Sequence, residues 1–206
     1  MEKLEYKKVY KELYLPKEEP SVIDVPEIGF AMIEGAGDPN GEDFAEATEA
    51  LYSFSYVVKM SYKSKDVPEG FYDYTVFPLE GVWDLIDKDK PATLKSNLKY
   101  QIMIRQPDFL TPELFQRFLE ETKRKKPNSK LEGLCFVRIL DGLCCQMMHV
   151  GSYDTEPVSF ARMEAYCEAQ GYQRSAKTHR EIYLGDPRKT EPEKLKTVLR
   201  VQIVKK

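Results

Sequence analysis

The sequence GFAMIEGAGDPNGEDFAEATEALYSFSYVVKM, residues 29–60, joins a short apolar run, a glycine-rich turn and a long amphipathic segment. Acidic residues stand near the start of the amphipathic segment, where they suit a helix N-terminus. Its apolar side chains recur at the spacing of one helical face: Phe44, Ala47, Leu51, Phe54 and Val58. This stretch predicts a strand, a turn and a helix, and strands at 71–77 and 99–106 are expected to follow.

A second stretch, LCCQMMHVGSYDTEPVSFARMEAYCEAQGY at residues 143–172, has the same order of features. A strand-like run leads into a polar turn and then a helix with Phe160, Met163 and Cys167 on one side. Gly171 is expected to end this helix. Strands are predicted at 178–184 and 196–204, so both halves are read as β-α-β-β.

The two halves, about 20–106 and 134–204, are joined by a predicted helix at about 109–126. Thr111 is suited to cap this helix and Pro112 to occupy its first position. The Asp141-Gly142 pair between two apolar runs predicts a hairpin of 134–140 with 143–150. In the first half, residues 20–26 are expected to form the matching hairpin with the following run at 30–35.

These elements predict a single α+β domain over residues 1–206, built from two pseudo-repeats. The expected architecture is a concave, mainly antiparallel sheet of about eight strands, with the helices on one face. A ligand cleft is expected between the two halves, since small molecules commonly bind where similar units meet.

Composition argues against some classes of function. The chain has 31 basic and 34 acidic side chains and a net charge of −3, which disfavours binding to a nucleic-acid phosphate backbone. The basic run at 123–127 suits the C-terminal end of the linking helix. No apolar signal segment opens the chain and no long apolar run follows, so we expect a cytoplasmic protein that does not enter a membrane.

No metal or other cofactor is expected. The four cysteines form no C-x-x-C pair, and neighbouring residues on a strand point to opposite faces, which makes Cys144 and Cys145 poor partners for one metal ion. The turn GAGDPNG at 35–41 lacks the spacing of a phosphate-binding loop. We interpret it as the strand-to-helix turn of the repeat.

The predicted strand THREIYL, residues 178–184, carries the most suggestive polar side chains. Alternation places His179, Glu181 and Tyr183 on one face and the residues between them on the other. The Glu181 face is either a solvated strand surface or the polar corner of a pocket. A carboxylate among aromatic rings can bind a cation, and a desolvated one can act as a general base for water.

The first half offers a comparable group, in which Glu80 and Trp83 stand just past Tyr74 and Phe77. Each of these residues also has an ordinary structural interpretation. Trp83 can belong to the core, and Glu80 can shape the turn at the following glycine. His149, at the end of a predicted strand, is either structural or part of a ligand site.

The chain resembles the GyrI-like small-molecule-binding proteins. The motifs that carry the resemblance occur in order over nearly the whole chain: DVPEIGFAMIEGAGDPNG (24–41), FPLEGVW (77–83), MIRQPDF (103–109), MMHVGSYDTEP (147–157) and HREIYLGDPRKTEPEKLKTVLR (179–200). The resemblance implies a duplicated β-α-β-β fold with a ligand pocket between the units. It also implies that this is a stand-alone member, since no helix-turn-helix segment is attached.

Two functions follow from the resemblance. Some family members bind lipophilic cations through an acidic residue among aromatics, and some stand-alone members hydrolyse cyclopropane-bearing toxins. On this basis Glu181 is the expected catalytic carboxylate and Tyr183 the assisting hydroxyl. The expected ligand-binding residues are Glu80, Trp83, Tyr74, Phe77, Tyr153 and His149, with Glu80 and Trp83 on the wall opposite Glu181.

The expected partner is a lipophilic, planar or cationic small molecule, bound by a monomer or homodimer. The alternative is a protein-interaction module without catalysis, because the family takes its name from a gyrase-inhibiting relative. Exposed strand edges would serve such a protein target.

Overall fold

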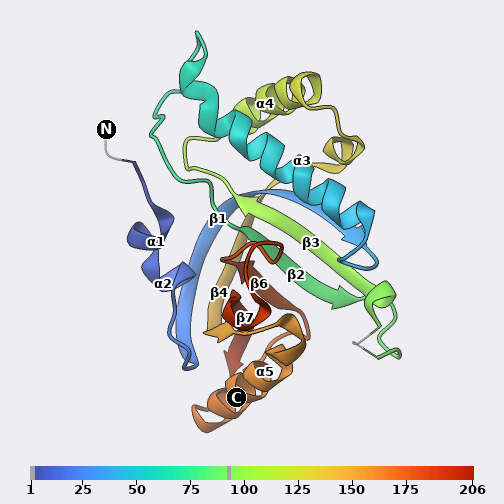
Figure 1. The fold of residues 1–206 in the computed structure, drawn as a ribbon. Coiled ribbons are helices and arrows are strands. Elements are labelled where there is room, and N and C mark those ends of the chain that lie inside the picture. Colours follow the sequence, from blue (N-terminus) through green and yellow to red (C-terminus); the bar gives the residue numbers. More distant parts are fainter. Residues whose placement is uncertain (1–2, 92–93) are drawn as a thin grey trace. The chain divides into compact units, whose positions relative to one another are not determined.

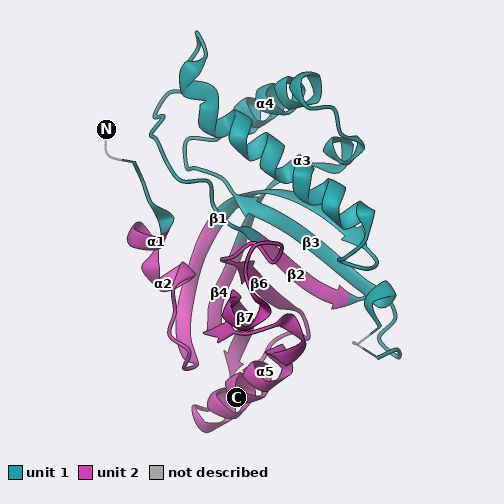
Figure 2. Cartoon of the chain, viewed as in Figure 1, with its two compact units in different colours: residues 1–6, 28–79, 85–139 teal, residues 7–27, 80–84, 140–206 magenta. Residues whose placement is uncertain are grey.

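The computed structural model describes residues 3–91 and 94–206 (Figure 1). Its contacts divide the chain into two compact units (Figure 2). Unit 1 contains residues 1–6, 28–79 and 85–139, and unit 2 contains residues 7–27, 80–84 and 140–206. The predicted division into pseudo-repeats at 20–106 and 134–204 remains a prediction.

The fold is α+β, with seven strands in the described parts of the chain instead of the expected eight. The strands are β1 (Ser21–Ala36), β2 (Leu79–Leu85), β3 (Leu98–Arg105), β4 (Cys135–Val150), β5 (Tyr172–Arg174), β6 (His179–Tyr183) and β7 (Lys196–Lys205). They are hydrogen-bonded in the order β4-β1-β3-β2-β6-β7-β5, and β4 also pairs with β7. The pairings of six strands therefore close into a ring to which β5 is added. β1, β2 and β4 each contribute residues to both units.

The helices are α1 (Tyr6–Val9), α2 (Lys11–Tyr14), α3 (Glu42–Lys59), α4 (Pro112–Lys125) and α5 (Glu156–Ala169). Short 3₁₀ turns are η1 (Met60–Lys63), η2 (Lys95–Asn97), η3 (Ser129–Gly133), η4 (Tyr153–Thr155) and η5 (Pro192–Lys194). The predicted turn at 35–41 is confirmed as the link between β1 and α3. Gly37 has a φ of 110° there, a conformation that favours glycine.

Unit 1 is built around α3, α4 and the antiparallel pair of β1 with β3. The predicted cap of α4 is confirmed, because Thr111 Oγ1 accepts a hydrogen bond from the Leu114 amide at 3.2 Å. Phe54 of α3 packs on Phe115 of α4 with ring centroids 4.8 Å apart. Figure 1 shows these two helices lying side by side.

Unit 2 contains α5 and the antiparallel ladder of β6, β7 and β5. Met163 and Cys167, predicted to share the inner side of α5, are buried in an apolar core with Met147 of β4 and Leu199 of β7. Burial of apolar side chains in this core favours docking of the helix, at about 1.5–3 kcal/mol for a large one such as Met163. β6 is joined to this core through β7, with which it forms an antiparallel ladder.

Two predicted hairpins are wrong, since β4 and β1 are each a single strand of 16 residues. Gly142 has a φ of 63°, but Asp141 does not have a positive φ. The two favoured two-residue hairpin turns both need positive φ at the first central position, which is Asp141 here, so a left-handed Gly142 alone does not give either turn. The hairpin was predicted from the Asp-Gly dipeptide alone, which does not reveal the backbone conformation that Asp141 adopts.

The predicted strand at 71–77 is also absent from the sheet. The Leu4 amide donates to the Asp73 carbonyl at 2.8 Å, and the Thr75 amide donates to the Leu4 carbonyl at 2.9 Å. This extended segment thus pairs with one residue of the N-terminal segment. β2 begins only at Leu79, immediately after Pro78, which has no amide hydrogen to donate to a ladder.

No helix within residues 3–91 and 94–206 is long and apolar enough to cross a membrane. All four cysteines are free thiols, and three of them, Cys144, Cys145 and Cys167, are buried. Burial raises the pKa of Cys144 to about 12, so this thiol stays protonated at neutral pH.

Candidate ligand-binding site

Alternation along β6 gives two different faces, as predicted. His179, Glu181 and Tyr183 interact with one another through their side chains, whereas Arg180 makes its contacts elsewhere. β2 runs antiparallel to β6, with Gly81 opposite Glu181 and Trp83 opposite His179. Trp83 therefore lies on the Glu181 face of this strand pair.

A directed chain of hydrogen bonds connects Trp83, Tyr183 and Glu181. Trp83 Nε1 donates to the Tyr183 hydroxyl at 2.8 Å, and that hydroxyl donates to Glu181 Oε2 at 2.8 Å. The direction is fixed because an indole nitrogen can only donate, which leaves the tyrosine hydrogen for the carboxylate. The side chain of Glu181 is buried, with the residue 8% exposed, so its oxygens depend on these donors.

Two further side chains lie at the more exposed edge of this group. His179 Nε2 lies 2.9 Å from Glu181 Oε1, and its side chain is 26% exposed. The rings of Tyr153 and Tyr183 meet edge to face with centroids 5.9 Å apart, and Tyr153 is 38% exposed. Among the aromatic rings near Glu181, that of Tyr153 is well exposed, whereas Trp83 is only 7% exposed.

Gly81 provides the space for the tryptophan–tyrosine contact. A Cβ atom at this position would lie 2.9 Å from Trp83 Nε1 and 3.2 Å from the Tyr183 hydroxyl oxygen. The first distance is shorter than real Cβ contacts allow. A side chain at residue 81 would therefore separate Trp83 from Tyr183.

A second carboxyl group, that of Glu156, contacts Glu181. Glu156 is the first residue of α5, is 6% exposed and is hydrogen-bonded to Glu181. Burial, followed by the charge of Glu181 and the hydrogen bond with it, raises the pKa of Glu156 to about 9. The positive end of the helix dipole favours an ionised acid at this position, but desolvation outweighs it. We call Trp83, Tyr153, Glu156, His179, Glu181 and Tyr183 the Glu181 cluster.

The tyrosine hydroxyls of the cluster remain protonated at neutral pH. Burial, with the charge of Glu181 as the next cause, raises the pKa of Tyr183 well above its ordinary value. The same two causes raise the pKa of Tyr153 to about 12. Both hydroxyls can therefore donate hydrogen bonds but do not supply a phenolate.

The other face of the β2–β6 pair carries a buried ion network. Arg180 donates to Glu80 Oε2 at 3.0 Å and to Asp141 at 2.9 and 3.1 Å. Burial tends to lower the pKa of Arg180, but the carboxylates of Glu80 and Asp141 raise it above its ordinary value. The predicted position of Glu80 beside Trp83 differs from this arrangement, because residues 80 and 83 of one strand point to opposite faces.

A cavity beside this network is lined by residues that include Arg180 and Arg200, and its volume is about 40 Å³. Sites for drug-sized molecules are usually about 300–1,000 Å³, so this cavity suits a water molecule rather than a ligand.

His149 is engaged on both ring nitrogens within unit 2. Nε2 lies 3.0 Å from the Ser152 carbonyl, so we place the ring proton there, and Nδ1 accepts from the Ser159 hydroxyl at 2.9 Å. Thr155 Oγ1 lies 3.2 Å from the same Nε2. His149 thus fixes the turn that leads to Tyr153 and Glu156, which is a positioning role.

Tyr74 and Phe77 lie in unit 1, whereas the Glu181 cluster lies in unit 2. Each is 1% exposed, and their ring centroids are 6.1 Å apart in a group of packed aromatics. The Lys59 amine lies 5.5 Å from the Tyr74 centroid and 2.7 Å from Asp73 Oδ1. In this structure both predicted ligand-binding residues serve the core of unit 1.

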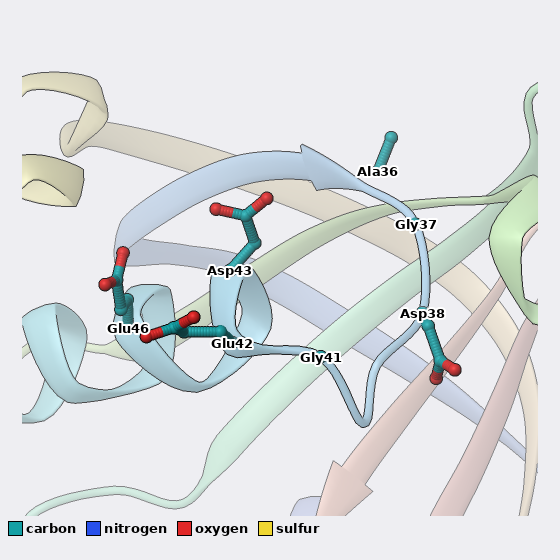
Figure 3. Close-up of a pocket in the computed structure, with 7 residues that line it drawn as sticks. All are labelled: Ala36, Gly37, Asp38, Gly41, Glu42, Asp43 and Glu46. Carbon is teal, nitrogen blue, oxygen red and sulfur yellow. The ribbon is translucent and has the colours of Figure 1, made fainter.

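A larger hollow, of about 330 Å³, lies in unit 1 at the start of α3 (Figure 3). Figure 3 shows the carboxylates of Asp38, Glu42, Asp43 and Glu46 around it. Asp38 accepts hydrogen bonds from the Asn40 amide and side chain at 2.8 and 2.9 Å. Glu42 and Asp43 stand in the first turn of α3, where acids stabilise the helix N-terminus, and Asp38 fixes the preceding turn, so these three have a structural explanation without a ligand.

Of the residues in the Glu181 cluster, Glu181, Tyr183, Trp83 and Tyr153 were candidates from the sequence, whereas Glu156 was not. The only signal available for Glu156 was its place at the start of a predicted helix, where acids are common for reasons of helix stability. Its burial against Glu181 depends on how α5 packs in unit 2 and has no local sequence signature.

Comparison with known proteins agrees with the resemblance seen in the motifs. The model of the GyrI-like small molecule binding domain family matches residues 18–204. A hydrolase from Listeria innocua has a crystal structure with 37% sequence identity and a TM-score of 0.90, covering 98% of this chain and 100% of its own. An uncharacterized conserved protein from Listeria innocua covers the same shares at 38% identity and a TM-score of 0.92.

A more distant structure, the C-terminal domain of EcmrR, is 14% identical and has a TM-score of 0.54. It covers 91% of this chain and 98% of its own, and this likeness shows a shared fold alone. No curated protein sequence matches the chain.

Proposed function

Since the chain belongs to the GyrI-like small molecule binding domain family, we propose that the Glu181 cluster binds lipophilic, planar or cationic small molecules. We further propose that the cluster hydrolyses cyclopropane-bearing electrophiles. The single observation that carries this proposal is the hydrogen-bond chain from Trp83 through Tyr183 to Glu181. Similarity to a Listeria innocua protein described as a hydrolase supports the catalytic part.

Binding of a cation follows from the chemistry of the cluster. A carboxylate in a largely buried position has lost part of its hydration, and a cation that pairs with it restores favourable electrostatics. The faces of Trp83, Tyr153 and Tyr183 can add cation–π and stacking contacts of about 0.5–2 kcal/mol each. Tyr153, the most exposed of the three, is the residue that a ligand meets first.

Hydrolysis requires that Glu181 accept a proton from water. The two Glu181 oxygens can accept about four hydrogen bonds in all, and His179, Tyr183 and Glu156 account for three, which leaves one position for water. In the proposed step, the water oxygen bonds to a ring carbon and Glu181 takes the water proton. The strained carbon–carbon bond breaks, its electron pair moves onto a conjugated carbonyl oxygen of the ligand, and that oxygen then takes the proton from Glu181, which completes the addition of one water.

Tyr183 is suited to assist the same step. Its hydroxyl donates to Glu181 at rest and is protonated at neutral pH. Once Glu181 has taken a proton, the hydroxyl is free to turn toward the oxygen on which charge develops. Trp83 holds that hydroxyl in place from the other side.

The proposal is tested with the full chain and three variants: Glu181→Gln, Tyr183→Phe and Glu168→Gln. Glu168 is an exposed residue of α5, so its variant controls for the loss of one negative charge. Tetraphenylphosphonium binding is measured by calorimetry, and the gain of one water by a cyclopropane-containing alkylator is followed by mass spectrometry.

Glu181→Gln should weaken cation binding at least about tenfold, equivalent to about 1.4 kcal/mol, and abolish hydrolysis. Tyr183→Phe should slow hydrolysis more than it weakens binding, and Glu168→Gln should match the wild type. Equal binding and turnover by wild type and Glu181→Gln would contradict the site assignment.

A further inference from the structure

One carboxyl oxygen of Glu156 accepts no hydrogen bond from the other residues of the Glu181 cluster. Its Oε1 atom is buried and has no hydrogen-bond partner among the described residues. The residue is 94% buried and contacts Glu181. An unsatisfied buried polar atom is uncommon in folded proteins and calls for an explanation.

The groups that face Glu156 come from two neighbouring elements. β6 contributes Glu181 and Tyr183, and η4 contributes Tyr153 and Asp154. His179, also on β6, pairs with the far side of the Glu181 carboxylate. In the described part of the chain, no lysine or arginine forms an ion pair with either Glu156 or Glu181.

Two buried carboxyl groups in hydrogen-bond contact cannot both ionise without a large electrostatic cost. They instead hold one proton between them. The raised pKa of Glu156, about 9, agrees with this geometry. At neutral pH the pair therefore carries one negative charge and one transferable proton.

We propose that Glu156 and Glu181 form a single proton-sharing acid pair within the ligand site, and that a bound cation expels the shared proton. This inference rests on the proposed function, because it requires the cation to bind at the Glu181 cluster. The cation replaces the proton as the counter-charge between the two carboxylates. The site then offers two negative charges to a cationic ligand and only one when it is empty.

The pH dependence of binding follows directly. Below about pH 9 the free protein holds the proton on Glu156, so each cation bound releases up to one proton. The dissociation constant should then fall by up to about tenfold for each pH unit, and it should level off above about pH 9. A neutral ligand of the same shape has no charge with which to displace the proton and should bind without this dependence.

Calorimetry measures the released proton directly. Tetraphenylphosphonium and the neutral probe triphenylphosphine oxide are titrated into wild type and Glu156→Gln, from about pH 7.5 to 9.5, above the range in which histidines normally titrate. Buffers of different ionisation enthalpy give the number of protons released. Glu168→Gln is the matched control for the substitution on the same helix.

The wild type and Glu168→Gln should release close to one proton for each phosphonium bound at the lower pH, and none with the neutral probe. Glu156→Gln should show no proton release and a dissociation constant that does not vary with pH. Phosphonium binding by the wild type without proton release would overturn the acid pair and leave the proposed function standing. Absence of any phosphonium binding would overturn the proposed function, and with it the proposal that cation binding releases the shared proton.

A measurement on the wild type alone guards against a variant that fails to fold. Carbon NMR of the glutamate carboxyl groups should show one carboxyl that titrates above about pH 8 in the free protein. If every glutamate carboxyl titrates below about pH 6, the acid pair does not exist.

Discussion

The indole nitrogen of Trp83 donates a hydrogen bond to the hydroxyl of Tyr183 at 2.8 Å, across 100 residues of sequence. This bond leaves the tyrosine hydrogen available only to Glu181, so the acid and its donor have a fixed orientation before any ligand arrives. Preorganised groups of this kind stabilise a transition state without the cost of reorienting at each turnover.

Replacing Trp83 with phenylalanine tests that orientation. The variant keeps an aromatic ring but loses the donor, so the Tyr183 hydroxyl is held only by Glu181. We expect a loss of about 1–3 kcal/mol in the free energy of unfolding, measured with urea, and a larger relative loss in hydrolysis than in cation binding. Tyr56→Phe, at a tyrosine that is 52% exposed, should stay within about 0.5 kcal/mol of wild type.

Gly81→Ala tests the close packing over β2. The added Cβ would lie 2.9 Å from Trp83 Nε1, so the indole must move and the bond to Tyr183 must lengthen. We expect a destabilisation of about 1–3 kcal/mol together with weaker phosphonium binding. The control is Gly133→Ala, where a Cβ meets no atom within 4 Å, and it should be neutral or slightly stabilising. Equal behaviour of the two alanine variants would contradict this packing.

Arg180→Met tests the buried ion network on the opposite face of β6. Removing the guanidinium leaves the carboxylates of Glu80 and Asp141 buried without their cation. Breaking such a pair from one side costs about 3–5 kcal/mol, which chemical denaturation can measure. Arg188→Met, whose side chain is 84% exposed, should change stability by less than about 0.5 kcal/mol. A small effect of Arg180→Met would mean that the network is open to water.

Stability should fall as pH rises, because of Glu156. Its pKa is raised from the ordinary value of 4.5 to about 9 in the folded protein. The folded state therefore holds more protons than the unfolded state between these values. The free energy of unfolding should decrease across this window by up to about 1.4 kcal/mol for each pH unit.

The measurement is urea unfolding at several pH values from about 5 to 9. In Glu156→Gln, which has no ionising group at this position, the free energy of unfolding should depend less on pH. Glu168→Gln should retain the pH dependence of the wild type. A wild-type profile that rises over this range would show that Glu156 is ionised in the folded protein.

The three longer helices, α3, α4 and α5, were predictable from sequence because their burial follows a local period, whereas the short α1 and α2 were not predicted. Thr111 caps α4 as expected, and Met163 and Cys167 of α5 point into one core. The strands were harder, since pairing depends on distant segments. Nothing in the sequence of 71–77 shows that it pairs with Leu4 in place of the sheet, and nothing in Asp141-Gly142 shows that only Gly142 adopts a positive φ.

The site was predictable to the extent that it depends on alternation along one strand. That rule alone placed Glu181 and Tyr183 together and separated them from Arg180. The contact with Glu156 and the enclosure of His149 arise from tertiary packing, which a single sequence does not record. The expected pairing of Glu80 with Trp83 overlooked that a spacing of three residues reverses the face of a strand.

The most direct test is an experimental structure of the full chain with bound tetraphenylphosphonium. We predict that the cation lies against Glu181 and Glu156, with the rings of Trp83 and Tyr153 within about 6 Å of it. A cation found instead in the hollow of Asp38, Glu42, Asp43 and Glu46, with the Glu181 cluster unchanged, would show that the ligand site is not the one proposed.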